Sequence, residues 1–328
     1  MPATTAITTR PLANVSIDLD GLGCYHQIHS LAPPADPVAI YTTALPRFLD
    51  LFEELGVRCT LFAIGRDLAH PRAAAALAAA VERGHEVASH TWSHPYNLRD
   101  WSKLSVAEEL DRAADAIRGA VGVHPVGFRT PGYNVSTRIV HLLAERGYRY
   151  DSSVLASPAY YAAKGAVMTA MALRGRPSGS SLVDSSTLSA PIQPYRPSRW
   201  DVTRAGDRKH SMPIWEIPIG VTPGTRLPVI GTSVCALPAP ALSVLYRSFR
   251  FRQRTLQLEL HGIDLLASDD QCVHLQLSRR QPDLRRSWQK KRESLRHFIQ
   301  LMMNDYAMVT LETMVDELDA AAGPTVVV

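Results

Sequence analysis

The chain has 328 residues, of which 46% are hydrophobic and 20% charged, as is usual for a soluble globular protein with a sizeable core. Its formal net charge is only +4 and it has no motif of stacking aromatic residues, so it has neither feature of a nucleic-acid-binding protein. No apolar run approaches the roughly 20 residues of a membrane span. Its four cysteines are scattered and its first ten residues have no apolar core, which favours the reducing cytoplasm.

The first predicted strand, 14–17, leads directly into Asp18-Leu19-Asp20. In an extended segment, side chains two residues apart point the same way, so both carboxylates would face one site. A turn with a helix-capping aspartate is the alternative interpretation. Beyond a Pro-rich loop, the apolar spacing predicts a helix within 38–55, a strand at 58–64 and a second helix from about 71 to 84.

Two histidines follow the third predicted strand, 85–88, namely His90 and His94. Imidazole is a common ligand of zinc, cobalt, nickel and iron, and the four-residue spacing lets both rings reach one ion. Because a catalytic metal usually takes three protein ligands, a carboxylate must come from elsewhere in the chain. Unpaired surface histidines are the alternative.

The pattern of strand, polar loop and helix then repeats. A helix is predicted from a capping box at 105–108 to about 119, a strand at 126–128 ends at Arg129, and a helix at 136–146 precedes a strand, 148–150, that ends at Asp151. In barrels of parallel strands the carboxyl ends of the strands carry the active site. We therefore predict a βα barrel with these polar groups on one rim.

The repeat breaks between about 155 and 254, and we interpret this loop-rich stretch, which includes a strand at 214–219, as an insertion over the rim of a single domain, 1–328. It holds aromatic residues that could stack on a sugar and arginines suited to phosphate: Tyr160, Tyr161, Tyr195 and Trp200, with Arg174, Arg176, Arg196 and Arg199. Packing of the insertion onto the rim is the alternative. Its last part, 239–254, mixes Leu and Phe with arginines, which indicates either peripheral contact with the inner face of an anionic membrane or a solvated helix.

The barrel pattern resumes after the insertion. A strand at 255–260 ends at His261, a helix is predicted at 283–303, and a last strand, 307–311, precedes a closing helix, 313–321. A lone histidine is more often a packed residue than a catalyst, but its position on the same predicted rim favours a catalytic role for His261.

Together, five motifs resemble those of the polysaccharide deacetylase superfamily, the NodB-homology enzymes of carbohydrate esterase family 4. The motifs are Asp-Leu-Asp at 18–20, Ser-His-x-x-x-His at 89–94, Arg-Thr-Pro-Gly at 129–132, the aspartate at 151, and Leu-x-Leu-His at 258–261. The resemblance implies an α/β fold, a distorted (β/α)7 barrel, with the insertion between the fourth and fifth motifs. It also implies one divalent metal ion, with Zn²⁺ expected and Co²⁺, Ni²⁺, Fe²⁺ or Mn²⁺ as alternatives.

The same resemblance assigns roles to individual residues. Three match the metal ligands: Asp20, His90 and His94. Asp18 matches the general base and Arg129 the residue that orients it. His261 matches the general acid, and Asp151 matches the partner found near the active-site histidine.

The motifs also depart from those of the polysaccharide enzymes. The first is Asp-x-Asp rather than Asp-Asp, and serines follow Asp151 where an aromatic residue is expected. Both features are more similar to the branch that contains the deformylase of undecaprenyl-phosphate 4-formamido-4-deoxy-arabinose. The resemblance therefore implies a metal-dependent amide hydrolase that removes formyl or acetyl from an amino sugar, with a lipid-phosphate-linked sugar as one candidate. An amidase of cyclic imides, ureides or other small non-sugar amides, and an inactive barrel that serves for binding, are the alternatives.

Overall fold

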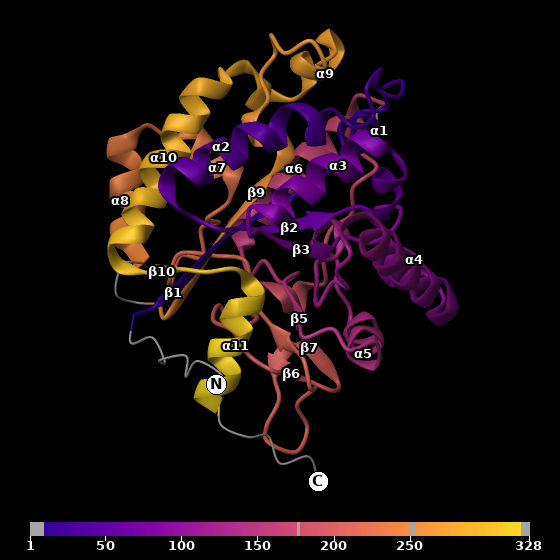
Figure 1. Ribbon diagram of the computed structural model, residues 1–328, viewed down its shortest axis with the longest axis vertical. Coiled ribbons are helices and arrows are strands. Elements are labelled where there is room, and N and C mark those ends of the chain that lie inside the picture. Colours follow the sequence, from indigo (N-terminus) through magenta and orange to yellow (C-terminus); the bar gives the residue numbers. More distant parts are fainter. Residues whose placement is uncertain (1–9, 176–177, 250–252, 323–328) are drawn as a thin grey trace.

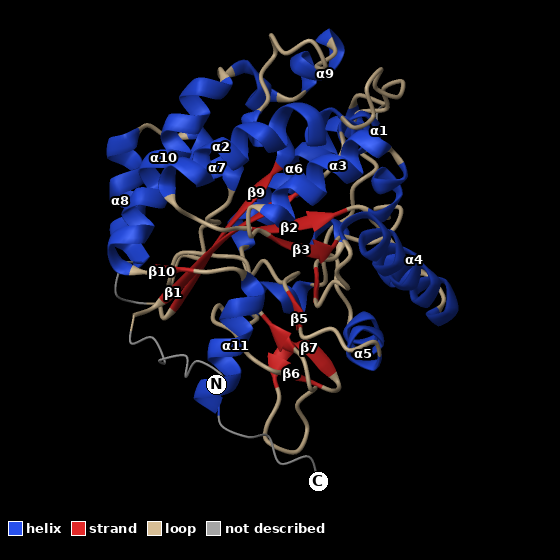
Figure 2. Cartoon of the chain, in the orientation of Figure 1, coloured by secondary structure: helices blue, strands red, loops and turns tan. Residues whose placement is uncertain are grey.

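A computed structural model describes residues 10–175, 178–249 and 253–322. Its centre is a curled sheet of parallel strands (Figures 1 and 2). The strands follow one another in the order β10, β1, β2, β3, β4, β5, β8, and β9 also pairs with β1. Their bounds are β1 (Leu12–Asp18), β2 (Thr60–Ala63), β3 (Glu86–Ser89), β4 (Gly127–Phe128), β5 (Tyr150–Asp151), β8 (Trp215–Glu216), β9 (Thr255–His261) and β10 (Ala307–Met308). The expected barrel-like fold of parallel strands is thus confirmed.

Side chains alternate between the two faces of this sheet. Along β1, Val15 and Ile17 belong to the main apolar core, whereas Ser16 and Asp18 make polar contacts inside the barrel. Every residue of β1 is buried, so both faces are covered. The apolar face packs under the helices, and the polar face is available to build a site.

Helices form a layer around the outside of the sheet. Neighbouring pairs in this layer run from α8 through α10, α2, α3 and α4 to α5 (Figure 1). The bounds are α2 (Leu45–Leu55), α3 (Pro71–Glu82), α4 (Lys103–Val121), α5 (Thr137–Glu145), α8 (Ala239–Phe249) and α10 (Trp288–Asp305). Helix α11 (Leu311–Ala322) packs near the lower end in Figure 1, and the short helices are α1 (Leu22–Ile28), α7 (Gly231–Ala236) and α9 (Leu275–Arg280).

Some predicted boundaries differ from the observed ones. The cap of α4 is Ser102, whose Oγ accepts a hydrogen bond from the Ser105 backbone N–H at 3.1 Å, so the capping position is three residues earlier than expected. The basic helix predicted at 283–303 begins at Trp288, because a 3₁₀ turn over Pro282–Arg285 precedes it. These shifts lie at element ends, where local signals are weakest.

The stretch predicted as an insertion contributes to the main sheet. Strand β8 lies within it and pairs in parallel with β5, and the chain beyond β8 then pairs with β9 through the Gly220 N–H and the Gln257 carbonyl, 3.0 Å apart. A Cβ on Gly220 would overlap that carbonyl oxygen, so the approach requires glycine. The remaining elements of the stretch are a helix, α6 (Pro158–Leu173), and an antiparallel pair, β6 (Pro197–Ser198) and β7 (Asp201–Ala205), seen at the lower end of Figure 2.

Helix α6 was not expected in this loop-rich stretch. Its start has ordinary signals: Pro158 occupies the first turn, and the Ser157 Oγ accepts a hydrogen bond from the Tyr160 backbone N–H at 3.3 Å. Its sequence lacks the apolar periodicity of a helix that covers a core, because apolar residues occur all around it.

The segment 239–254 packs on the barrel through one face of α8. Leu242 and Tyr246 are buried, and the Tyr246 hydroxyl donates a hydrogen bond to Asp305 at 2.7 Å, whereas Val244 is 66% exposed. Residues 250–252 of the predicted stretch 239–254, and Arg176, lie outside the described residues. Among the helices that are described, none is both long and apolar enough to cross a bilayer.

Candidate active site

Polar side chains from four strand ends meet at one end of the barrel. Asp18 and Asp20 come from β1, His90 and His94 from β3, and His261 from β9. Arg129 follows β4 and lies beneath them. A cavity of about 520 Å³ opens over this group and is lined by Asp18, Asp20, His90 and His261 among others. Parallel strands bring their carboxyl ends together in this way because they all run in one direction.

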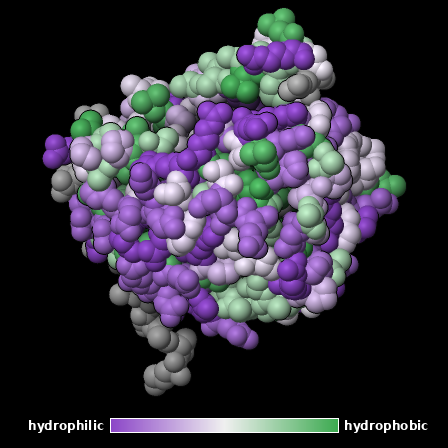
Figure 3. All heavy atoms as spheres, turned by 90° about the horizontal axis from the view of Figure 1, so that it is seen from above, coloured by the Kyte–Doolittle hydropathy of each residue, from purple (hydrophilic) through white to green (hydrophobic). Residues whose placement is uncertain are grey.

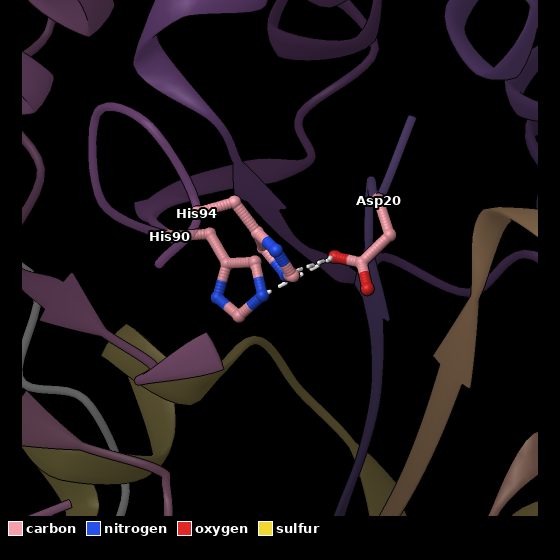
Figure 4. Close-up of side chains that lie close together, drawn as sticks. All are labelled: Asp20, His90 and His94. Atoms are coloured by element: carbon pink, nitrogen blue, oxygen red, sulfur yellow. Dashed lines mark ion pairs between the residues drawn. The ribbon is translucent and has the colours of Figure 1, made fainter. Parts of the chain in front are cut away.

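The predicted metal ligands converge on one point. The Asp20 Oδ1 lies 3.3 Å from the His90 Nε2 and 3.2 Å from the His94 Nε2, and Figure 4 shows both rings facing the carboxylate. Thr91 and His94 hold this loop with left-handed backbone angles, φ 67° and 59°. Such angles are uncommon outside glycine and occur where surrounding structure enforces them.

The atoms that Asp20, His90 and His94 turn toward one another can bind a cation. The His90 Nδ1 lies 2.8 Å from the Arg129 carbonyl oxygen, which only accepts, so Nδ1 donates to that carbonyl and Nε2 is the ring nitrogen that faces the Asp20 carboxylate. The Asp20 Oδ1 and the His94 Nε2 are buried without a hydrogen-bond partner among the described residues. One carboxylate and two imidazoles also form a donor set typical of zinc. These three residues therefore fit a divalent metal ion.

The charges of the triad point to the same conclusion. Burial alone would raise the pKa of Asp20, but His94 and His90 lower it well below its usual value. Burial likewise lowers the pKa of His94, yet Asp20 raises it well above its usual value. The carboxylate thus requires a positive charge at this point, which a proton or a metal ion supplies.

Asp18 is held by a fully buried arginine. The Arg129 Nη1 donates to the Asp18 Oδ1 at 2.5 Å, and its Nε donates to the Ser152 carbonyl at 2.7 Å. Its Nη2 donates to the Ser16 and Ser152 hydroxyls at 3.1 and 2.9 Å, and the guanidinium lies 4.0 Å from the centre of the Phe62 ring. The other carboxylate oxygen of Asp18 lies 3.8 Å from the His90 Nε2, so it faces the triad.

A glutamate that the motifs did not identify supports His261. The Glu259 Oε1 lies 3.1 Å from the His261 Nδ1 and accepts a hydrogen bond from the Tyr133 hydroxyl at 3.0 Å. The His261 Nε2 is 4.0 Å from the Asp20 Oδ2. Burial lowers the pKa of His261, but Glu259, Asp20 and Asp18 raise it to about 9. The sequence held a signal for Glu259, because on β9 it shares a face with His261, two residues away, while Leu260 between them points to the opposite face.

Asp151 does not occupy the predicted position beside the active-site histidine. It lies opposite Glu216 across the β5–β8 pair, and its Oδ1 accepts a hydrogen bond from the Ser153 hydroxyl at 2.6 Å. The Ser153 Oγ in turn accepts the Thr130 backbone N–H at 2.8 Å, next to Arg129. The prediction of a histidine partner at Asp151 is therefore corrected, because the strand register places Glu216 beside Asp151 and Glu259 beside His261.

The carboxyl groups of Asp151 and Glu216 both have raised pKa values in the folded chain. Burial raises the pKa of Asp151 to about 6, and burial together with Asp151 raises that of Glu216 well above its usual value. The Asp151 Oδ2 and the Glu216 Oε2 lack hydrogen-bond partners among the described residues. Two buried carboxyl groups in adjacent register avoid a double negative charge by keeping a proton.

The aromatic residues and arginines of the predicted insertion mostly lie away from the cavity. Tyr160 lines it, but the Tyr195 hydroxyl donates to the Val202 carbonyl at 2.7 Å, and Trp200 is 67% exposed elsewhere on the surface. Tyr161 is buried against Tyr160. These side chains therefore do not form a common sugar-stacking platform.

The arginines have other partners or lie outside the cavity lining. Arg196 pairs with Asp319 at 2.7 Å, and Arg199 donates to the Lys209 carbonyl at 3.0 Å. Arg174 is exposed at the end of α6. Lys164 is the one lysine or arginine among the described residues that line the cavity.

Part of the chain matches a known protein family. Residues 36–150, which contain His90, His94 and Arg129, match the family model described as polysaccharide deacetylase. Chitin deacetylase 1 of Cryptococcus neoformans var. grubii is 30% identical over 103 residues, which are 31% of this chain and 21% of that protein. Peptidoglycan deacetylase of Helicobacter pylori is 27% identical over 111 residues, 34% of this chain and 37% of that protein. The alignments thus span about a fifth to two fifths of these relatives.

A solved structure shows the same fold over nearly the whole chain. It is a crystal structure from Mycobacterium smegmatis of a protein assigned to the polysaccharide deacetylases, with a TM-score of 0.57 and 18% identity. The match covers 98% of this chain and 94% of that one. Residues 36–150 therefore match the polysaccharide deacetylase family model, and nearly the whole chain shares its fold with that solved structure.

Proposed function

We propose that this chain is a metal-dependent hydrolase that removes a formyl or acetyl group from the nitrogen of an amino sugar. One observation carries the proposal: a metal-type triad, an arginine-held carboxylate and a carboxylate-held imidazole lie within a few ångströms of one another beside one cavity. The named relatives are deacetylases of chitin and peptidoglycan, which supports an N-acyl amino sugar as the substrate class.

Asp20, His90 and His94 would hold the ion, with Zn²⁺ the expected one. When bound, such an ion lowers the pKa of water and polarises an amide carbonyl. Asp18, which accepts a hydrogen bond from the guanidinium of Arg129, accepts the proton of the attacking water.

His261 acts on the other product of the cleavage. Its Nε2 faces the site and gives a proton to the departing amine, because an unprotonated amine is a poor leaving group. Glu259 holds the opposite ring nitrogen and so keeps Nε2 directed at the substrate. Asp151 lies outside the cavity lining, and we assign it a positioning role through Ser153 and the Thr130 loop.

The test is amine release from a panel of N-formyl and N-acetyl amino sugars, free and phosphate-linked, by the zinc-loaded protein. His90→Ala should lose both the bound metal and the activity. Asp18→Asn should keep the metal and lose about 10²–10⁴-fold in kcat. A matched control is His141→Ala, since His141 contacts the Arg199 carbonyl away from the cavity. A His90→Ala protein that still holds one ion per chain would show that the ligand assignment is wrong.

The same panel decides between the candidate substrates. Turnover of a cyclic imide or ureide, with no amine released from any amino sugar, would favour an amidase of small non-sugar amides. Binding of metal and sugar without turnover would favour an inactive barrel. Preference for the phosphate-linked sugars would support the lipid-linked branch, and Lys164 is then the cation available on the cavity wall.

We also propose that the protein works in the cytoplasm and contacts the inner face of the membrane through 239–254. The four cysteines are all unpaired, which suits a reducing compartment. The exposed Val244 and Arg247 of α8 could meet an anionic surface. Flotation with phosphatidylserine vesicles at low salt tests the contact, and Val244→Glu should weaken it. Protein that stays at the bottom of the gradient contradicts it.

A further inference from the structure

The outer wall of the catalytic cavity is an apolar helix that faces solvent. Helix α6 has one charged residue, Lys164, among sixteen, and Tyr161 is its one buried side chain. Val167 is 59% exposed and Leu173 is 85% exposed. A surface helix normally turns its apolar stripe to the core and its polar residues to water. Helix α6 therefore leaves uncovered the kind of surface that is usually buried.

This apolar surface is continuous with the reacting groups. Val167, Met168 and Met171 of α6 line the same cavity as Asp18 and His261. Across the cavity, the aliphatic lining comes from other elements: Ile28, Ile230 and Ile263. The cavity thus leads from a charged floor to an aliphatic outer part.

We propose that this outer part of the cavity binds an aliphatic chain on the sugar side of the substrate, so that the substrate is an amphiphilic amino sugar. This inference rests on the proposed function, in which the acyl group removed is small and the rest of the substrate fills the cavity. A chain lying along Val167, Met168 and Met171 would withdraw their apolar surface from water. Unbranched methionines adapt to a flexible chain.

Two other occupants fit the observations less well. A second or third sugar ring would need hydrogen-bond partners on every wall; the rest of the lining supplies some, such as Ser180 and Gln281, but α6 offers only Lys164 and the Tyr160 hydroxyl. A flat bilayer would need a broad apolar face. On the face seen from above Figure 1, apolar residues form only small, separate patches in a hydrophilic surface (Figure 3). A single aliphatic chain needs only the aliphatic side chains that line the cavity.

Binding can be measured without turnover by using the product class. We would titrate the wild-type protein by calorimetry with methyl, butyl, hexyl and octyl glycosides of glucosamine, below their micelle concentrations. Each methylene that leaves water should lower Kd by up to about fourfold, so the octyl glycoside should bind about 10²-fold more tightly than the butyl glycoside. A Kd that does not change with chain length would overturn the inference.

Two variants locate the chain. In Met168→Gln/Met171→Gln, polar side chains of similar size replace the aliphatic lining, and Kd should no longer depend on chain length. Thr169→Gln is the control, because Thr169 is exposed on the same helix and is absent from the lining; it should keep the wild-type dependence. Equal dependence in all three proteins would place the chain elsewhere and refute the α6 subsite.

Further arms separate this inference from the proposed function. Turnover of methyl glycosides of N-acetyl- or N-formyl-glucosamine tests the function alone, and its absence would not alter the binding series. If kcat/KM depended on the length of the N-acyl chain and not on the length of the glycoside chain, the aliphatic chain would belong to the acyl group that is removed. That result would overturn the assignment. A third result would identify a bilayer-binding surface instead. In that case the wild-type protein floats with phosphatidylcholine vesicles, Met168→Gln/Met171→Gln does not, and the Kd of the glycosides does not depend on their chain length.

Discussion

The buried ion pair between Arg129 and Asp18 tests most sharply how this site is held together. We predict that Arg129→Met lowers the free energy of unfolding at pH 7 by about 3–5 kcal/mol, because a buried carboxylate is left without its partner. Methionine fills much of the arginine volume but replaces none of the four hydrogen bonds that the guanidinium donates.

The size of this effect follows from burial. The side chains of Arg129 and Asp18 are 0% and 2% exposed, so water cannot solvate the carboxylate that remains. The Arg146–Asp111 pair has a similar contact distance, 2.7 Å, but Asp111 is 57% exposed. Surface pairs of this kind contribute about 1 kcal/mol or less. Arg146→Met is therefore the matched control and should cost no more than that.

The assay is urea unfolding at pH 7, followed by circular dichroism, for a double-mutant cycle. It compares the wild type, Arg129→Met, Asp18→Asn and the double variant, together with the Arg146→Met control. The double variant removes both charges and should be more stable than Arg129→Met alone. If the two single losses simply add in the double variant, or if Arg129→Met costs no more than the control, the pair does not act as a buried unit and this reasoning is wrong.

Three further predictions concern the groups around this pair. Glu259→Gln should lower kcat/KM by about 10–100-fold while circular dichroism shows an intact fold, because His261 loses the carboxylate that orients it; an unchanged kcat/KM would remove Glu259 from the site. Because the folded-state pKa of Asp151 is raised to about 6, its contribution to stability is present at low pH and is lost as pH rises through about 6. Asp151→Asn, which cannot ionise, should therefore raise the free energy of unfolding at pH 8 by up to about 3 kcal/mol, with the gain shrinking towards pH 4, and a gain independent of pH would contradict the raised pKa. Zinc at 100 times its Kd should stabilise the chelator-treated protein by about 2.7 kcal/mol, and the thermal melt of Asp20→Asn should not respond.

The sequence alone was enough to predict the barrel and most of its polar rim. Short β-prone runs alternate with helices along the chain, and a polar residue ends each run, as at Asp18, His90, Arg129 and His261. Because parallel strands align their carboxyl ends, this order along the chain already implies proximity in space. The structure brings these four side chains together as expected.

Only the tertiary structure decided which carboxylates act as partners. The family resemblance suggested Asp151 for the histidine, but the β5–β8 register places Asp151 against Glu216, and β9 carries its own glutamate, Glu259, to His261. Register between strands far apart in the sequence depends on the packing of the whole sheet, which local patterns do not encode. Helix α6 was missed for a related reason: a helix whose apolar residues line a cavity lacks the one-sided periodicity by which core-covering helices are predicted.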